Sequence, residues 1–200
     1  MSGSRLRIVG GKWKGRTIES PDGLETTRPT TERTRERVAS MVLSACGLDL
    51  TGASVLDAFA GSGSVGFELL SRGAAHATFV DSDKRCVERI RKAARSLGAS
   101  SEEVSTVCGD VFIVASTRLP ASPFDVVFLD PPYAADANGV SAAVSALGST
   151  GQLADGALVV YEHATGAPGL ECMGLMFDRS RSQGTTTVDL LIWEGESQGQ

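Results

Sequence analysis

The chain has 200 residues, of which 42% are hydrophobic and 22% are charged, and its formal net charge is −5; this describes one globular domain rather than two. No apolar run approaches the roughly 18 residues needed to span a bilayer, and residues 1–16 lack the apolar segment of an export signal, so we expect a cytoplasmic protein with reduced, buried cysteines. A metal site is not expected, because the candidate ligands are few and widely spaced: Cys46, Cys86, Cys108, Cys172, His76 and His163.

The first elements expected along the chain are a hairpin and a helix. Residues 6–9 and 12–18 alternate between apolar and polar side chains around Gly10 and Gly11, which predicts two antiparallel strands joined by a two-residue turn. A threonine cap and helical apolar spacing then predict a helix over residues 30–47.

This leading part is basic, whereas the rest of the chain is acidic. Residues 5–37 hold nine Lys and Arg against five Asp and Glu, of 19 and 24 in the whole chain. A basic segment on an acidic body indicates a polyanion held at one edge. We therefore treat residues 1–48 as an arm that is not an independent domain.

From residue 54 onward, short apolar strands alternate with helices. The expected strands are residues 54–59, 77–81, 103–108, 124–129, 157–161, 175–182 and 185–193, with helices over 64–72, 83–97 and 140–147. The last two strands predict an antiparallel hairpin. This pattern predicts an α/β domain over residues 49–194, with a doubly wound, mostly parallel seven-stranded sheet, followed by a disordered tail at 195–200.

A glycine-rich turn follows the first of these strands. Residues 61–66 match G-x-G-x-x-G, and Asp81 lies about 20 residues further on, as in dinucleotide-binding proteins. Asp57, at the carboxyl end of the strand, favours a different cofactor, because a carboxylate would repel a pyrophosphate but attract the sulfonium and ammonium groups of S-adenosylmethionine. The alternatives are a turn acid without a ligand role and a nicotinamide oxidoreductase.

The strand 124–129 ends in four residues of distinctive chemistry, Asp130, Pro131, Pro132 and Tyr133. Proline fixes its φ angle, which holds the neighbouring carbonyl groups at set angles. Asp130 and the Pro131 carbonyl can then accept both hydrogens of the exocyclic amine of a nucleobase, and Tyr133 can stack on the plane of that base. The alternative is an ordinary turn at the end of a strand.

These motifs resemble those of a known family. The sequences DAFAGSG at residues 57–63 and DPPY at 130–133 look like those of amino-group nucleic-acid methyltransferases. RIVGGKWKGR at residues 7–16 and TRPT at 27–30 look like the RsmD family, and the resemblance covers nearly the whole chain. That family methylates the exocyclic N2 of one guanine in 16S ribosomal RNA, preferably in an assembled or assembling small subunit. The resemblance implies a class I, Rossmann-like methyltransferase that uses S-adenosylmethionine.

The resemblance also implies roles for individual residues. The catalytic set is Asp130, Pro131, Pro132 and Tyr133, and the cofactor-binding set is Asp57, Phe59, Gly61, Gly63, Asp81, Asp110 and Val111. The expected RNA-binding residues of the arm are Arg7, Lys12, Trp13, Lys14, Arg16 and Arg28. The chain departs from the family pattern at Thr34 and Gln183, where we expect an apolar and an aromatic residue.

Several interpretations stay open at this point. Trp13 either stacks on a base, packs on arginines that contact phosphate, or folds back onto the domain. Arg28 either binds a phosphate or the cofactor carboxylate or forms a surface salt bridge. The basic helix at residues 83–97 is either a second RNA surface or a solvated helix face. Rival functions are an adenine-N6 or cytosine-N4 methyltransferase and a non-catalytic RNA-binding assembly factor. We expect the protein to be a monomer.

Overall fold

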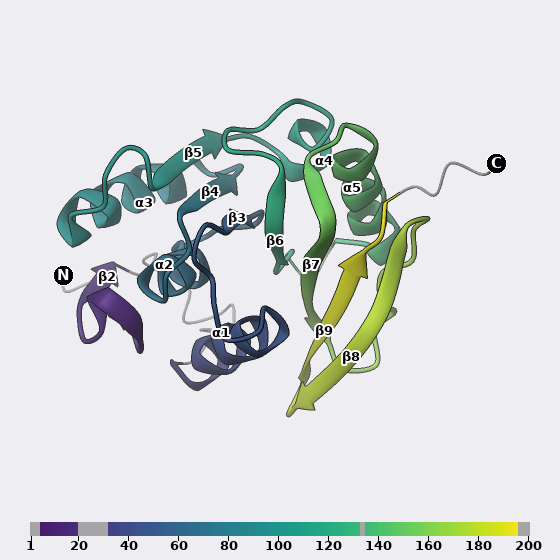
Figure 1. Cartoon of the computed structure of the whole chain (residues 1–200), viewed down its shortest axis with the longest axis horizontal. Helices are drawn as coiled ribbons and strands as arrows, with labels where there is room; N and C mark the ends of the chain where they lie inside the picture. The colour runs from purple at the N-terminus through teal and green to yellow at the C-terminus, as the bar shows by residue number, and fades with distance from the viewer. Residues whose placement is uncertain (1–4, 20–31, 133–134, 196–200) are drawn as a thin grey trace.

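The computed structural model describes residues 5–19, 32–132 and 135–195, and a seven-stranded sheet forms its centre (Figure 1). The strand order is β5-β4-β3-β6-β7-β9-β8. The strands are β3 (Ser54–Asp57), β4 (His76–Asp81), β5 (Val104–Cys108), β6 (Phe124–Leu129), β7 (Leu153–Ala164), β8 (Leu175–Gln183) and β9 (Thr186–Trp193). The β3 to β7 strands pair in parallel, and β9 pairs antiparallel with both β7 and β8. The predicted fold class is therefore confirmed.

Helices cover both faces of this sheet (Figure 1). The helices α1 (Glu32–Ala45), α2 (Ser64–Ser71) and α3 (Lys84–Leu97) pack on one face, and α4 (Val111–Val114) and α5 (Ala137–Ser149) pack on the other. Val55 and Leu56 are neighbours in β3, yet they belong to the two different cores. Because successive side chains of a strand point to opposite faces, a strand covered on both sides is apolar at most positions.

The N-terminal hairpin forms, but not with the predicted turn. The strands β1 (Arg5–Arg7) and β2 (Thr17–Glu19) pair antiparallel, and a short 3-10 helix, η1 (Gly11–Trp13), lies between them. Gly10 and Gly11 do not form a two-residue turn, so this detail of the prediction is wrong. Gly11 has a φ of +72° and packs so closely on α2 that a Cβ atom would lie 1.7 Å from the Ser71 carbonyl oxygen. The glycines serve a close approach of the backbone to α2.

The C-terminal hairpin of β8 and β9 agrees with the prediction. Gly184 takes a φ of +61° in its turn, and Gln183, one of the two departures from the family pattern, accepts a hydrogen bond of 2.8 Å from Arg37 of α1. The side chain of Thr34, the other departure, lies outside the described residues, as do residues 196–200 of the predicted tail.

The described part of the chain contains neither a membrane-spanning helix nor a metal-binding cluster. No helix there has the length and apolarity that crossing a membrane requires. Nor do its His, Cys, Asp and Glu side chains gather into a cluster of three or more that could hold a metal ion.

Candidate active site at the carboxyl edge of the sheet

Four acidic residues come together where the parallel strands end. Asp57 ends β3, Asp81 ends β4, Asp110 follows β5 and Asp130 follows β6. Asp57 lies opposite Phe128, two residues before Asp130. Ligands of open α/β sheets bind outside this edge, so the structure brings the predicted cofactor and catalytic residues to one place.

The glycine turn between β3 and α2 leaves an open surface at this edge. Gly61 and Gly63 have φ angles of +53° and +72°, which glycine adopts readily. A Cβ atom at Gly61 would meet no atom within 4 Å, whereas one at Gly66 would lie 2.4 Å from the Phe79 ring. Gly66 thus allows α2 to pack on β4, and Gly61 leaves space for a ligand.

Asp57 is a buried carboxyl group, with 2% of the residue exposed. The pKa of this carboxyl group is raised to about 7, mainly by burial and in smaller part by the nearby Asp81 charge, although the Gly66 amide, which donates a hydrogen bond of 3.0 Å, acts to lower it. A cation bound next to Asp57 would offset the cost of its buried charge. The site therefore fits a positively charged ligand better than a phosphate.

Asp81 organises the glycine turn. One of its carboxylate oxygens accepts a 2.7 Å hydrogen bond from the Gly61 amide, and the other accepts a 2.8 Å bond from the Asp83 amide. A carboxylate has about four acceptor positions, so Asp81 can hold the turn and still accept from the hydroxyl groups of a ribose.

The loop after β5 contributes a further acid and an aromatic pair. Asp110 caps α4 by accepting a 3.0 Å hydrogen bond from the Phe112 amide. Phe112 is partly exposed, and its ring lies 5.7 Å from that of Phe59. The side chain of Val111 is buried in the core, which leaves only its backbone for the predicted cofactor contact. The sequence analysis did not single out Phe112, although an aromatic residue in the turn after β5 was the available signal.

The residues after β6 form the other half of the edge. Asp130 and Pro131 are half-buried and Pro132 is exposed. The Pro132 carbonyl accepts a 2.8 Å hydrogen bond from the Ala135 amide, which fixes the chain as it leaves β6. Tyr133 lies outside the described residues.

A buried carboxylate that the sequence analysis missed attaches the arm. Glu68 of α2 is 1% exposed and accepts 2.8 Å hydrogen bonds from the amides of Val9 and Gly10. It also forms a 2.9 Å ion pair with Arg72. The available signal was an acidic residue in an otherwise apolar helical segment.

The cations of the arm differ in their surroundings. Lys12 pairs with Glu103, and Arg16 donates to the carbonyl oxygens of Ser96 and Leu97 at the end of α3. Lys14 and Arg7 are exposed, and Arg28 lies outside the described residues. Binding of RNA by these cations stays a prediction.

Trp13 folds back onto the domain. It is 6% exposed, its ring meets the Phe67 ring edge-on at 6.3 Å, and its amide donates a 2.9 Å hydrogen bond to the Ser71 hydroxyl. The ring is therefore not available for stacking on a base, and a role of Trp13 in RNA binding through the cations packed on it stays a prediction. Lys12 covers the ring at 4.5 Å from its centroid.

The four cysteines are free thiols, as predicted. Burial was predicted for all of them and holds for Cys86, whereas Cys108, at the end of the edge strand β5, is exposed. His163 has a packing role, because its Nε2 atom lies 3.0 Å from the Asp189 carboxylate with both side chains largely buried.

Comparisons with known proteins identify the family. Residues 6–192 match the model of the family described as "Conserved hypothetical protein 95", the RsmD family. The chain belongs to this family. It is 32% identical to ribosomal RNA small subunit methyltransferase D of Escherichia coli K12 over 200 residues, which covers 100% of this chain and 95% of that protein.

Solved structures agree with this family membership. A putative methyltransferase from Escherichia coli superposes with a TM-score of 0.77 at 28% identity, over 96% of this chain and 99% of that one. A magnesium protoporphyrin IX methyltransferase from Synechocystis, solved with bound S-adenosylmethionine, has a TM-score of 0.60 at 21% identity, over 80% of this chain and 78% of that one. The second likeness shows the class I methyltransferase fold alone.

Proposed function

We propose that this protein transfers a methyl group from S-adenosylmethionine to the exocyclic N2 of a guanine in 16S ribosomal RNA. The observation that carries the proposal is the buried Asp57 beneath an open glycine turn, on the same sheet edge as Asp130 and Pro131. Full-length relatives named as methyltransferases of small-subunit ribosomal RNA support the choice of substrate. In this proposal the protein works as a monomer in the cytoplasm, where ribosomes assemble.

The residues of the turn suit this cofactor. Asp57 balances positive charge, Gly61 leaves room beside the turn, and Asp81 accepts from ribose hydroxyl groups. In the proposal, Asp110 and the backbone of Val111 hold the adenine, beside the ring of Phe59. When bound, S-adenosylmethionine supplies an electrophilic methyl group on a sulfonium.

The residues after β6 suit an amine. The nitrogen of an exocyclic amine is a weak nucleophile, because its lone pair is delocalised into the ring. Asp130 and the Pro131 carbonyl accept its two hydrogens, orient the nitrogen and stabilise the positive charge that develops on it. A strong base is not needed, because the proton can leave after the methyl group has been transferred. Tyr133 is proposed to stack on the base.

The choice of guanine N2 rests on the family, since the same acceptors suit adenine N6 or cytosine N4. Asp130→Ala tests the site: we expect methylation of small subunits to fall by about 100-fold or more, with affinity for S-adenosylmethionine within about twofold of the unmodified chain. Methyl incorporation and calorimetry are the measurements.

A deletion strain tests the substrate. We expect its 16S RNA to lose one methylated guanosine, measured by mass analysis of nuclease digests, and to regain it with the unmodified chain but not with Asp130→Ala. An unchanged RNA digest, with a methylated base lost from DNA instead, would favour the adenine or cytosine alternative. Full rescue of every cellular defect by Asp130→Ala would favour a non-catalytic assembly factor.

A further inference from the structure

The positive charge of this acidic protein is concentrated in two segments that are far apart in the sequence. Residues 5–19 and 84–97 together hold eleven of the 19 Lys and Arg but two of the 24 Asp and Glu. The cations are Arg5, Arg7, Lys12, Lys14, Arg16, Lys84, Arg85, Arg89, Arg91, Lys92 and Arg95. The rest of the chain is therefore strongly acidic. The net charge of −5 belongs to the whole chain and hides this division.

The fold brings the two segments together. Lys92 of α3 pairs with Glu19 of β2 at 2.6 Å, and Arg16 donates a 3.2 Å hydrogen bond to the Leu97 carbonyl at the end of α3. Figure 1 shows β2 next to α3, on the side of the molecule away from the C-terminal hairpin. The cations thus form one surface, the basic face, made of the β1–β2 segment and the outward side of α3.

Acidic neighbours do not neutralise the basic face. Glu19 lies among three cations, and Lys92, Arg5 and Arg89 all lower the pKa of its carboxyl group. At the border, Glu103 is paired with Lys12 and Asp83 with Arg85. Glu88 is the acid within α3. Eleven cations against these four acids leave a surplus of positive charge.

The outward row of α3 is exposed along its length. Lys84, Arg91 and Arg95 lie on one side of the helix by their spacing of seven and four residues, and all three are exposed. At 1.5 Å per residue, Lys84 and Arg95 stand about 16 Å apart along the axis. This row begins three residues after Asp81, so it starts at the rim of the candidate active site and leads away from it.

The basic face lacks the apolar centre of a protein interface. The large hydrophobic residues exposed in the described part of the chain are Leu48, Phe112, Ile113, Met173, Met176 and Phe177, all outside the two segments. Protein interfaces have an apolar core in which charged residues are depleted, whereas contacts to nucleic-acid phosphates are made by exposed Lys and Arg.

We propose that the basic face binds the phosphate backbone of RNA and that the outward row of α3 supplies a main part of the contact, together with the arm. This inference rests on the proposed function for the identity of the polyanion. The arm alone would place RNA at the edge of the domain, whereas α3 continues the surface to the rim of the active site.

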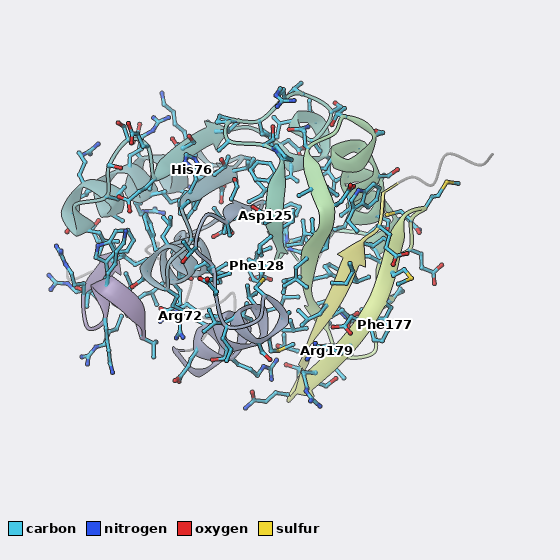
Figure 2. All side chains as sticks on the ribbon, in the orientation of Figure 1. Arg72, His76, Asp125, Phe128, Phe177 and Arg179 are labelled. Atoms are coloured by element: carbon cyan, nitrogen blue, oxygen red, sulfur yellow. The ribbon has the colours of Figure 1, made fainter. Side chains whose placement is uncertain are left out.

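A triple substitution tests this surface in the full chain. Lys84→Gln, Arg91→Gln and Arg95→Gln are combined, and the control combines Arg118→Gln, Arg179→Gln and Arg181→Gln, which removes three exposed arginines elsewhere (Figure 2 labels Arg179 on β8). Binding of naked 16S RNA and of small ribosomal subunits is measured at several salt concentrations. Affinity for S-adenosylmethionine is measured by calorimetry.

We expect the α3 variant to bind both RNA forms about tenfold or more weakly at ~0.1 M salt, with the slope of log affinity against log salt reduced by about 2 to 3. The control should stay within about threefold, and cofactor affinity should not change in either variant. Equal losses in both variants, no loss in the α3 variant, or an unmodified chain that does not bind naked RNA would each overturn the proposal. Weaker binding to subunits alone would indicate a ribosomal protein as the partner and would also overturn it.

Failure of the proposed function has a separate signature. It would show as absence of cofactor-dependent methylation by the unmodified chain, and the binding experiment does not depend on turnover. A chain that binds RNA through α3 but does not methylate it would support RNA binding by the basic face and would contradict the proposed methyltransferase activity.

Discussion

Two buried carboxyl groups in neighbouring parts of the molecule, Glu68 and Asp57, differ in their hydrogen-bond partners and in the charges around them. Glu68, at the junction of arm and domain, accepts from two backbone amides and pairs with Arg72. Asp57, at the carboxyl edge, accepts from the Gly66 amide, but burial outweighs that bond and raises its pKa to about 7. One acid is stabilised by the protein itself, and the other is costly to ionise until a cation arrives.

Under the proposed function, this difference separates a structural charge at Glu68 from a ligand-binding charge at Asp57. A buried charge that is fully hydrogen-bonded fixes the position of the groups around it, and removing it leaves those groups without partners. A buried acid with a raised pKa instead lowers the stability of the ligand-free protein above the ordinary pKa of aspartate. Substitutions at the two sites should therefore have opposite effects on stability.

The largest effect is expected at Glu68. Glu68→Ala leaves the Val9 and Gly10 amides and the Arg72 guanidinium without their acceptor, so we expect a loss of about 3–5 kcal/mol in the free energy of unfolding. Denaturant unfolding measures this loss. Glu171→Ala, at an exposed position, is the control and should change stability by less than about 0.5 kcal/mol.

The same substitution should release the arm. We expect RNA binding by Glu68→Ala to weaken about tenfold or more, with cofactor affinity unchanged in the folded fraction, because the glycine turn does not depend on Glu68. The milder Glu68→Gln keeps one acceptor oxygen, so its RNA affinity should lie between that of the unmodified chain and that of Glu68→Ala. A Glu68→Ala variant as stable as the control would show that the junction is not held by this carboxylate.

A smaller effect of opposite sign is expected at Asp57. At pH ~8 the folded protein must hold this buried carboxyl group ionised, so Asp57→Asn should stabilise the ligand-free protein by about 1–3 kcal/mol. It should also weaken binding of S-adenosylmethionine by about 10- to 100-fold, because the amide carries no charge. Thermal unfolding and calorimetry measure the two effects.

Asp125→Asn is the matched control, since Asp125 is an exposed aspartate on the neighbouring strand β6 and accepts from the Ser54 amide (Figure 2). Neither stability nor cofactor affinity should change much in this variant. A loss of stability in Asp57→Asn at pH ~8 would contradict the interpretation of Asp57 as a costly charge.

The raised pKa of Asp57 also makes the stability of the unmodified protein depend on pH. The raised pKa of Asp57 means that, between about pH 4 and pH 7, the folded state holds a proton that the unfolded chain has lost. The contribution of Asp57 to stability therefore falls as pH rises through this window and levels off above it.

Cofactor affinity should change in the other direction. We expect it to rise about tenfold between about pH 6 and pH 7.5 as Asp57 ionises, measured by calorimetry in buffers of equal ionic strength. Asp57→Asn should lack this rise. A profile that is the same in both proteins would assign the titration to another group.

Much of the fold is visible in local sequence patterns. Residues 124–129 form β6 with the predicted ends, and α3 begins one residue after its predicted start, because strand and helix periodicities are carried by neighbouring residues. The site acids Asp57, Asp81 and Asp130 could be located because parallel strands end at one edge.

The errors lie where distant contacts decide the local structure. Gly11 meets Ser71 and Trp13 meets Phe67, and nothing near residues 11–13 reveals those partners. The role of Glu68 was hidden for the same reason, since its acceptors bind amides 58 and 59 residues away in the sequence.

The hydrogen bond from the Gly61 amide to Asp81 has a consequence for ligand affinity. The carboxylate that would meet a ribose already secures the loop beside it, so this part of the binding surface has its final shape before any small molecule arrives. Ordering a loop during association reduces affinity, and here that ordering is completed during folding. Affinity at this edge is then governed by charge complementarity, and it should respond to ionic conditions more than to loop rigidity.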